Sequence, residues 1–238
     1  MKLYYDFHIH SCLSLCAEDD MTPANVAGMA SLAQLDTFAL TDHQSSKNCP
    51  ACAFHAGEYG LLFVPGMELC TREEVHVLCL FAETDDALAF TGYVGERLLV
   101  HPPAEKRALW RQTIMLPGDV PQGEEPLWLG SAADIGIYET ARLVREAGGL
   151  AIPAHIDRPS SSLLANLGLY DPGMGFSLCE VTAGCDVKRL LAEHPDVRGL
   201  RFIRGSDAHE LASIADRRYY LEVEERTPQA VLRALTQT

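Results

Sequence analysis

Short strand-like runs alternate with helix-like patterns along most of the 238-residue chain. Periodicity and capping residues predict helices at 24–35, where Thr22 is the expected N-cap and Pro23 opens the first turn, at 137–147, and after Thr227-Pro228. Runs rich in apolar and β-branched residues predict strands at 4–8, 37–41, 61–69, 75–81, 150–155, 177–182, 201–206 and 219–223. Strands and helices in alternation favour an α/β barrel or a doubly wound sheet.

The chain has the size and composition of one ordinary domain, with 47% hydrophobic and 22% charged residues. We therefore predict a single domain over residues 1–238. The segment 100–131 breaks the alternation, because it carries both tryptophans, several prolines and no clean period. We predict that it is an insertion, either a lid over the site or a hairpin packed on the outside.

Acidic residues outnumber basic ones by 33 to 19, which gives a formal charge of −14, and the basic residues form no run. Such a field repels polyphosphates, so we expect no extended nucleic-acid surface, although a local site could take a small anion if metal ions supply positive charge. No stretch approaches about eighteen apolar residues and the N-terminus does not resemble a signal peptide, so no membrane association is expected. The eight cysteines are expected to be free thiols in the cytoplasm. Composition does not indicate the oligomeric state.

Two histidines separated by one residue, His8 and His10, follow the first predicted strand. Residues two apart in an extended chain project from the same face, so both imidazoles can aim at one point. Imidazole is a ligand for zinc, iron and manganese. Other candidate ligands follow further strands, namely Asp42 with His43, Glu68, His155, and Asp207 with His209. Because α/β barrels build their sites at the carboxyl ends of strands, this set predicts one metal centre.

His76 lies at the beginning of a predicted strand rather than at its end. Only residues 71–74 separate this strand from the one that ends near Glu68, too few for a helical crossover, so we predict an antiparallel hairpin. The hairpin returns His76 to the side of Glu68. Six of the nine histidines then belong to the set, and His55, His101 and His194 are predicted to be surface residues.

As an ordered set, these motifs resemble the PHP superfamily, the polymerase and histidinol phosphatase domain. The resemblance spans residues 4–210 and rests on His8-Ile9-His10, Leu40-Thr41-Asp42-His43, Gly66-Met67-Glu68, Glu74-Val75-His76-Val77-Leu78, Pro153-Ala154-His155 and Gly205-Ser206-Asp207-Ala208-His209. It implies a distorted seven-stranded α/β barrel that holds two or three divalent ions, zinc, manganese or iron, and hydrolyses phosphoesters.

The resemblance also implies a role for each ligand by its motif position. His8, His10, Glu68 and Asp207 would hold the first metal, Glu68 would bridge to a second held by His76 and His155, and His43 and His209 would bind the third. Asp42 is expected to accept a hydrogen bond from a ligating imidazole.

One motif departs from the family pattern. The family places aspartate and glycine shortly after the second histidine, where this chain has Leu15 and Cys16. Aligned on the following helix, Glu18 takes the ligand position, with Asp19 or Asp20 as alternatives. Any of the three that is not a ligand simply favours the positive end of the helix dipole.

A metal ion lowers the pKa of bound water from about 15.7 toward roughly 7, so a metal-bound hydroxide is the expected nucleophile and no catalytic side chain is required. Arg158 and Lys47 follow His155 and His43 closely enough to be candidate phosphate-binding residues. A structural ion pair is an equal alternative for Arg158, and a solvated loop position is favoured for Lys47. The predicted function is metal-dependent hydrolysis of a phosphate ester of a small metabolite or nucleotide.

Three alternatives stay open. An amidohydrolase-type C–N hydrolase also uses a His-x-His pair, but it commonly bridges its metals with a modified strand-end lysine, and none of the four lysines ends a predicted strand. A non-catalytic metal-binding regulatory module is the second alternative. The third is a structural zinc site made by Cys12, Cys16, Cys49 and Cys52, for which buried or loop thiols are the simpler explanation.

Overall fold

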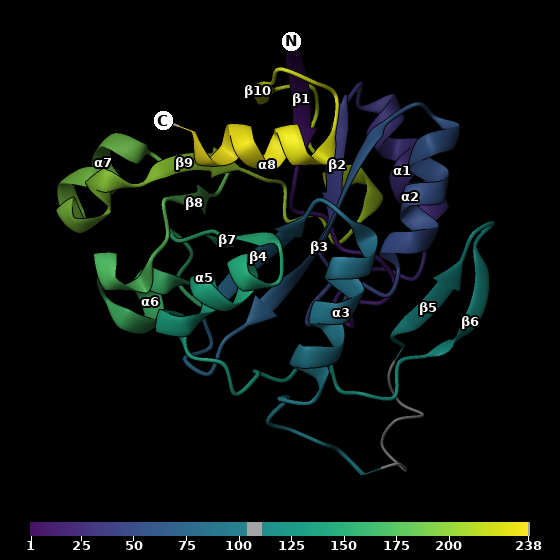
Figure 1. Cartoon of the computed structure of the whole chain (residues 1–238), viewed down its shortest axis with the longest axis horizontal. Coiled ribbons are helices and arrows are strands. Elements are labelled where there is room, and N and C mark those ends of the chain that lie inside the picture. Colours follow the sequence, from purple (N-terminus) through teal and green to yellow (C-terminus); the bar gives the residue numbers. More distant parts are fainter. Residues whose placement is uncertain (104–110, 238) are drawn as a thin grey trace.

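The computed structural model describes residues 1–103 and 111–237, and its elements alternate between strands and helices (Figure 1). In chain order they are β1 (Lys2–Asp6), α1 (Pro23–Leu32), β2 (Thr37–Leu40), α2 (Cys49–Glu58), β3 (Leu62–Cys70), β4 (His76–Phe81), α3 (Thr84–Gly95), β5 (Thr113–Leu116), β6 (Val120–Glu124), α5 (Ile137–Glu146), β7 (Gly149–Pro153), α6 (Leu163–Leu167), β8 (Leu178–Val181), α7 (Val187–Glu193), β9 (Arg201–Arg204), β10 (Tyr220–Glu222) and α8 (Pro228–Thr236). The fold is therefore of the mixed α/β class.

Six strands form one curled sheet in the order β10-β1-β2-β3-β4-β7 (Figure 1). β1, β2 and β3 run parallel, because α1 and α2 supply the crossovers between them, whereas β4 is antiparallel to both neighbours. The predicted hairpin is confirmed, with Cys70 opposite His76. Its turn closes through a 2.9 Å hydrogen bond from the Thr71 N–H to the Val75 carbonyl.

Two further strands, β8 and β9, form a separate parallel pair. The Ile156 N–H donates to the Glu180 carbonyl at 2.9 Å, which ties the chain after β7 to β8. A parallel bridge between Ile9 and Ala208 ties the chain after β9 to the chain after β1. These links bring the loops that follow β1, β7 and β9 to one end of the curled sheet.

The strands bury side chains on both faces, which explains their near-continuous apolar sequences. In β4, Leu78 and Leu80 pack in an apolar cluster that includes α8, whereas Val77 and Phe81 pack in another with α3 and α5. This alternation follows from the two-residue period of a strand. A third cluster joins β2 to α1 and α2.

Helix ends follow the predicted signals. The Thr22 hydroxyl accepts a hydrogen bond from the Asn25 N–H at 3.3 Å, and Gly148, just after α5, has a φ of 84° that favours glycine. Several predicted boundaries were wrong by one to three residues. The strands β1, β7 and β9 end two residues earlier than predicted, at Asp6, Pro153 and Arg204, and α1 ends at Leu32. His8 and His10 therefore both lie beyond β1, on either side of the bridge between Ile9 and Ala208.

Within the segment 100–131, the structure has an antiparallel hairpin of β5 and β6. Asn48 holds this hairpin against the start of α2, because its side chain accepts from the Met115 N–H at 2.8 Å and donates to the Thr113 carbonyl at 3.1 Å. Residues 104–110 of the predicted insertion lie outside the described residues. No helix in the described part of the chain is long and apolar enough to span a membrane.

Candidate metal centre

The Glu68 carboxylate, 1% exposed at the end of β3, is surrounded by five imidazoles. The shortest contacts of its two oxygens are 2.9 Å to His43 Nδ1, 3.0 Å to His76 Nδ1, 3.2 Å to His155 Nε2, 3.3 Å to His8 Nε2 and 3.4 Å to His10 Nε2. These histidines follow β1, β2 and β7 or begin β4, so the sheet topology brings them together.

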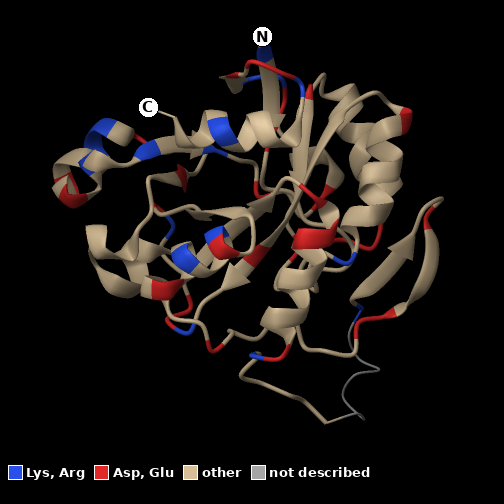
Figure 2. Ribbon diagram, in the orientation of Figure 1, with Lys and Arg blue, Asp and Glu red and all other residues tan. Residues whose placement is uncertain are grey.

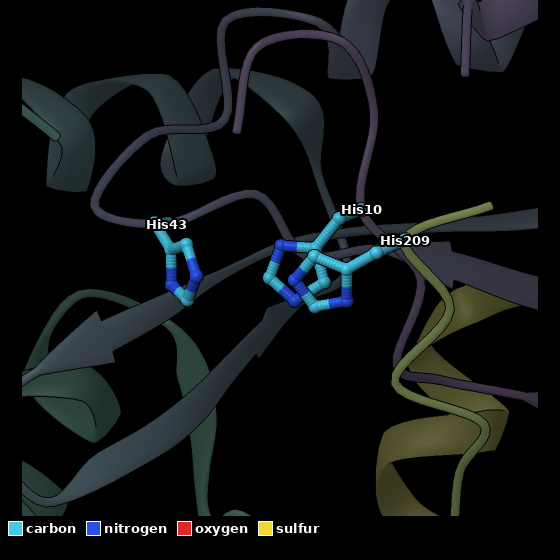
Figure 3. Close-up of side chains that lie close together, drawn as sticks. All are labelled: His10, His43 and His209. Atoms are coloured by element: carbon cyan, nitrogen blue, oxygen red, sulfur yellow. The ribbon is translucent and has the colours of Figure 1, made fainter. Parts of the chain in front are cut away.

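Asp207 and His209 complete the cluster from the loop after β9. Asp207 Oδ1 lies 3.2 Å from His8 Nε2 and 3.3 Å from His10 Nε2. The His209 ring stacks on the His10 ring with centroids 4.1 Å apart, and His43 faces both from the other side (Figure 3). The eight predicted ligands other than Glu18 thus form one cluster.

Hydrogen bonds to the outer nitrogens set the protonation of three imidazoles. His8 Nδ1 lies 2.8 Å from a carboxylate oxygen of Glu180, which can only accept, so Nδ1 carries a proton. His10 Nδ1 lies 2.9 Å from the Ser14 hydroxyl, whose own hydrogen goes to Asp42 at 2.7 Å, so this Nδ1 also donates. His209 Nδ1 donates to the Asp207 carbonyl at 2.9 Å. In neutral imidazoles, each Nε2 then presents a lone pair.

This arrangement fits divalent cations. His8 Nε2 and His10 Nε2 lie 3.2 Å apart, and two lone pairs at that distance repel each other unless a proton or a metal ion lies between them. Glu68 Oε2 and Asp207 Oδ2 are buried and accept no well-aligned hydrogen bond among the described residues, although His43 Nδ1 lies 2.9 Å from the first and Arg158 Nη1 2.5 Å from the second. Four groups of ligand atoms lie within 4.8 Å of one another: His8, His10 and Asp207; His8, Glu68 and His155; His43, Glu68 and His76; and His10, His43 and His209.

The electrostatics of the cluster point the same way. Burial alone would raise the pKa of Glu68, but the charges of His76, His8 and His43 hold it well below its usual value. Burial alone would lower the pKa of His8, but Glu180, Asp207 and Glu68 raise it well above 6.5. The carboxylates therefore stay ionised and draw in positive charge, which protons or metal ions can provide.

Two cluster residues have unusual backbone conformations. His155 has φ 30° and Asp207 has φ 53°, both in the left-handed region that non-glycine residues rarely adopt. Such strain persists only where the surroundings enforce it and is concentrated at functional sites. Gly205 permits the close approach beside them, since a Cβ there would lie 2.2 Å from Glu180 Oε1 and 2.7 Å from the His8 Cβ.

Glu180 is the site residue that the sequence reasoning missed. It is 2% exposed in the middle of β8, accepts from His8 Nδ1, and also accepts from the His155 N–H at 3.1 Å. One carboxylate therefore contacts the His8 ring and the backbone of His155, which follow two different strands. The available signal was a charged residue within the otherwise apolar run Leu178–Val181.

Asp42 acts one step further away than predicted. Its oxygens accept from the Ser11 N–H and hydroxyl, both at 2.6 Å, and from the Ser14 hydroxyl at 2.7 Å. Ser14 in turn accepts from His10, so the expected link from Asp42 to a ligating imidazole passes through a hydroxyl group.

The two residues predicted to bind phosphate lie in different places, and only one of them is beside the cluster. Arg158 Nη1 lies 2.5 Å from Asp207 Oδ2, beside the cluster. Lys47 pairs with Glu125 at 2.6 Å instead, because the chain after β6 reaches over it. The structure does not bring Lys47 to the cluster.

The acidic loop also differs from the expectation. Glu18, Asp19 and Asp20 are all exposed, and Asp19 pairs with Arg111. In the described ranges, none of the three carboxylates makes a hydrogen bond or ion pair with a cluster imidazole. The Cys16 thiol, by contrast, makes hydrogen bonds with two cluster imidazoles, those of His209 and His43. Burial opposes the ionisation of this thiol, but the hydrogen bonds lower its pKa to about 6.

The four cysteines proposed for a structural zinc site do not converge. Cys12 Sγ lies 3.8 Å from the Thr113 carbonyl, and the buried Cys49 Sγ lies 3.5 Å from the Gly66 carbonyl. Cys16 is directed to the histidine cluster. Among the histidines assigned to the surface, His55 is buried and bonds to Glu58 at 2.7 Å.

A cavity of about 270 Å³ adjoins the cluster and is lined by His155, Asp207, Glu180 and Arg158. A second cavity of about 490 Å³ shares Arg158 and Gly184 with the first, and Arg189 also lines it. A molecule larger than a phosphate group therefore has space on this side of the cluster.

Three kinds of solved structure share this fold. Endonuclease Q from Pyrococcus furiosus matches 99% of this chain with a TM-score of 0.69 and 18% identity, and the chain spans 56% of that protein. A protein assigned as a metal-dependent phosphoesterase from Bifidobacterium adolescentis matches 97% of this chain and 95% of its own, with a TM-score of 0.62 and 18% identity. An amidohydrolase from Chromobacterium violaceum matches 98% and 95%, with a TM-score of 0.61 and 18% identity.

These likenesses show the fold alone, and that fold is consistent with the resemblance that the motifs suggested. No protein-family model and no curated protein matches the sequence.

The expected absence of a nucleic-acid partner must be corrected. Endonuclease Q in complex with a 27-mer duplex, with an abasic lesion at the active site, matches 99% of this chain with a TM-score of 0.70. A negative net charge does not exclude a nucleic-acid partner, because local charge placement decides phosphate binding. Although the basic residues form no run in the sequence, many gather on the side of α7, β9 and α8 (Figure 2).

Proposed function

We propose that this chain is a metal-dependent phosphoester hydrolase. The observation that carries the proposal is the Glu68 carboxylate, fully enclosed and within 3.4 Å of a nitrogen from each of five imidazoles. Burying so many mutually repelling ligand atoms would destabilise a purely structural core, whereas two or three divalent ions would bind all of them favourably.

The ligand groups suggest how the ions are divided. His8, His10, Asp207 and Glu68 would hold the first ion, Glu68 with His76 and His155 the second, and His43 with His209 the third. The ions, zinc, manganese or iron, would supply a water of lowered pKa and neutralise phosphate charge. Glu180 and Ser14 would keep the Nε2 lone pairs of His8 and His10 directed inward.

Arg158 is suited to bind the substrate phosphate. Its side chain is 44% exposed and lines the 270 Å³ cavity, and its guanidinium pairs with Asp207 of the cluster. A guanidinium can hold two phosphate oxygens at once, so exchange of Asp207 for a substrate phosphate would keep its charge paired. The group esterified to the phosphate would then extend toward Arg189 and the larger cavity.

The proposal also covers the barrel architecture, the domain organisation and the cellular compartment. The strands β1, β2, β3, β4, β7, β8 and β9 would form the distorted seven-stranded barrel of PHP-type hydrolases, closed by the Ile9–Ala208 bridge. Residues 1–238 would be one domain with an insertion at 100–131. The eight free cysteines suit a reducing compartment such as the cytoplasm.

The experiment is a substrate panel with metal-loaded protein. We would measure phosphate or nucleotide release from phosphomonoesters, small phosphodiesters, nucleotides and a duplex containing an abasic site, using wild-type protein, His8→Ala and the control His101→Ala, whose side chain is exposed outside the cluster. We expect His8→Ala to lose metal and activity together and His101→Ala to keep both. An inactive wild type across the panel, with no metal lost on His8→Ala, would refute the proposal.

A C–N hydrolase is the second candidate, because the amidohydrolase from Chromobacterium violaceum shares the fold. Among the described lysines, Lys2 begins β1, Lys188 is in α7 and Lys47 pairs with Glu125, so none is placed to bridge metals beside Glu68. Amide substrates in the same panel distinguish the two reactions: cleavage of amides without phosphate release would favour this candidate.

A further inference from the structure

The loop between His10 and α1 brings Cys16 to the metal cluster. Two hydrogen bonds fix this loop over the cluster: the Glu18 N–H donates to the His209 carbonyl at 2.9 Å, and the His43 N–H donates to the Ser14 hydroxyl at 3.1 Å. Between these anchors, the Cys16 thiol makes hydrogen bonds with the side chains of both His43 and His209.

The three imidazoles beside Cys16 already form a group of metal-compatible atoms. His10, His43 and His209 each offer a nitrogen within 4.8 Å of the others, and their rings face one another (Figure 3). Glu68 Oε2, which is buried and accepts no well-aligned hydrogen bond among the described residues, lies 2.9 Å from His43 Nδ1 and 3.4 Å from His10 Nε2. This unsatisfied carboxylate oxygen indicates a cation beside the imidazoles independently of the thiol.

The carboxylates expected in this position are elsewhere. Asp19 is paired with Arg111, and Glu18 and Asp20 are exposed without a side-chain contact to the cluster among the described residues. Leu15 and Cys16 occupy the positions where the resemblance led us to expect aspartate and glycine. The third group of imidazoles therefore lacks a carboxylate of its own, and an anionic ligand is needed to balance a divalent ion.

We propose that the Cys16 thiolate is a ligand of the metal ion held by His43 and His209, in place of the expected carboxylate. This inference rests on the proposed metal centre and adds a sulfur donor to it. Thiolate and imidazole together favour zinc over manganese and magnesium, which prefer oxygen ligands. The proposed centre would therefore have one metal position with a sulfur donor, selective for a softer ion, and two metal positions with nitrogen and oxygen donors alone.

Cobalt substitution tests the ligand directly, without relying on activity. The full-length protein would be stripped with a chelator, titrated with Co²⁺ alone and followed in the near ultraviolet, where a thiolate bound to cobalt gives a charge-transfer band. Metal content would be measured in parallel by mass spectrometry under native conditions. Four variants would be compared with wild type: Cys16→Ser, Cys16→Asp, Glu18→Gln and, as the matched control, Cys185→Ser, whose partly buried thiol lies away from the imidazoles.

We expect the band in wild type, Glu18→Gln and Cys185→Ser, and its loss in both Cys16 variants. Cys16→Ser should also release its most weakly held ion at least about tenfold more readily, whereas Cys16→Asp should retain that ion without the band. Metal binding with no band, or a band that survives in Cys16→Ser, overturns the Cys16 assignment and leaves the proposed metal centre standing. A wild type that binds no metal refutes the metal centre itself.

Discussion

Replacement of Glu180 by glutamine tests whether a residue outside the ligand set controls the metal centre. The Glu180 carboxylate accepts from His8 Nδ1 at 2.8 Å and from the His155 N–H at 3.1 Å, both through Oε2, while Oε1 is buried without a partner. Glutamine has the same shape and can keep both hydrogen bonds through its amide oxygen. The substitution therefore removes mainly the negative charge behind His8.

The expected loss follows from the role of such carboxylates. Mutation of the residue that hydrogen-bonds a ligating histidine typically costs 10- to 100-fold in metal affinity, or about 1.4 to 2.7 kcal/mol. We expect the upper part of this range, because Glu180 is 2% exposed and little solvent is present to screen its charge. The unpartnered amide hydrogens of the new side chain add to the cost.

The assay is competition between the protein and a metal-buffering chelator, with circular dichroism as the check on folding. Glu58→Gln is the matched control, since Glu58 makes the same type of contact with His55 at 2.7 Å, but outside the cluster and with its carboxylate 54% exposed. We expect no change in metal affinity for Glu58→Gln. Unchanged affinity in a folded Glu180→Gln variant, or equal losses in both variants, would refute the reasoning.

Three further predictions concern packing, substrate binding and pH. Gly205→Ala places a Cβ 2.7 Å from the His8 Cβ, so we expect a denaturant titration to show a loss of about 1–3 kcal/mol in unfolding free energy, together with reduced metal content. The control Gly199→Ala, whose new Cβ meets nothing within 4 Å, should change neither quantity. Arg158→Met should raise KM about tenfold or more with a much smaller effect on kcat in steady-state kinetics, because a charged hydrogen bond to phosphate is lost; an unchanged KM would assign Arg158 to a structural ion pair with its cluster partner. In the metal-free protein, the raised pKa of His8 gives stability that is present below pH 6.5 and lost as pH rises through the raised value, and the lowered pKa of Glu68 gives stability that is present above pH 4.5 and lost as pH falls through the lowered value. Denaturant titrations should therefore find the metal-free protein most stable between these limits and the metal-loaded protein without the alkaline loss; identical pH profiles would contradict this account.

The sequence by itself determined the alternation of strands and helices and which eight residues gather in one cluster. His8 and His10 are separated by one residue, and the short turn after Glu68 leaves its strand no geometry except a hairpin, so His76 had to return beside it. These conclusions needed only local geometry. The periods of strands and helices and the length of a connection are properties of neighbouring residues.

Only the tertiary structure decided which groups make hydrogen bonds to the outer nitrogens of the cluster imidazoles. Glu180 reaches His8 across 172 positions of sequence, and Asp42 reaches His10 through Ser14. The sequence favoured Glu18 as a ligand, whereas the folded loop presents Cys16, because side-chain direction depends on how the loop is anchored to His43 and His209. A ligand motif follows from local spacing, but the charge, tautomer and donor type of a metal centre depend on contacts between distant strands.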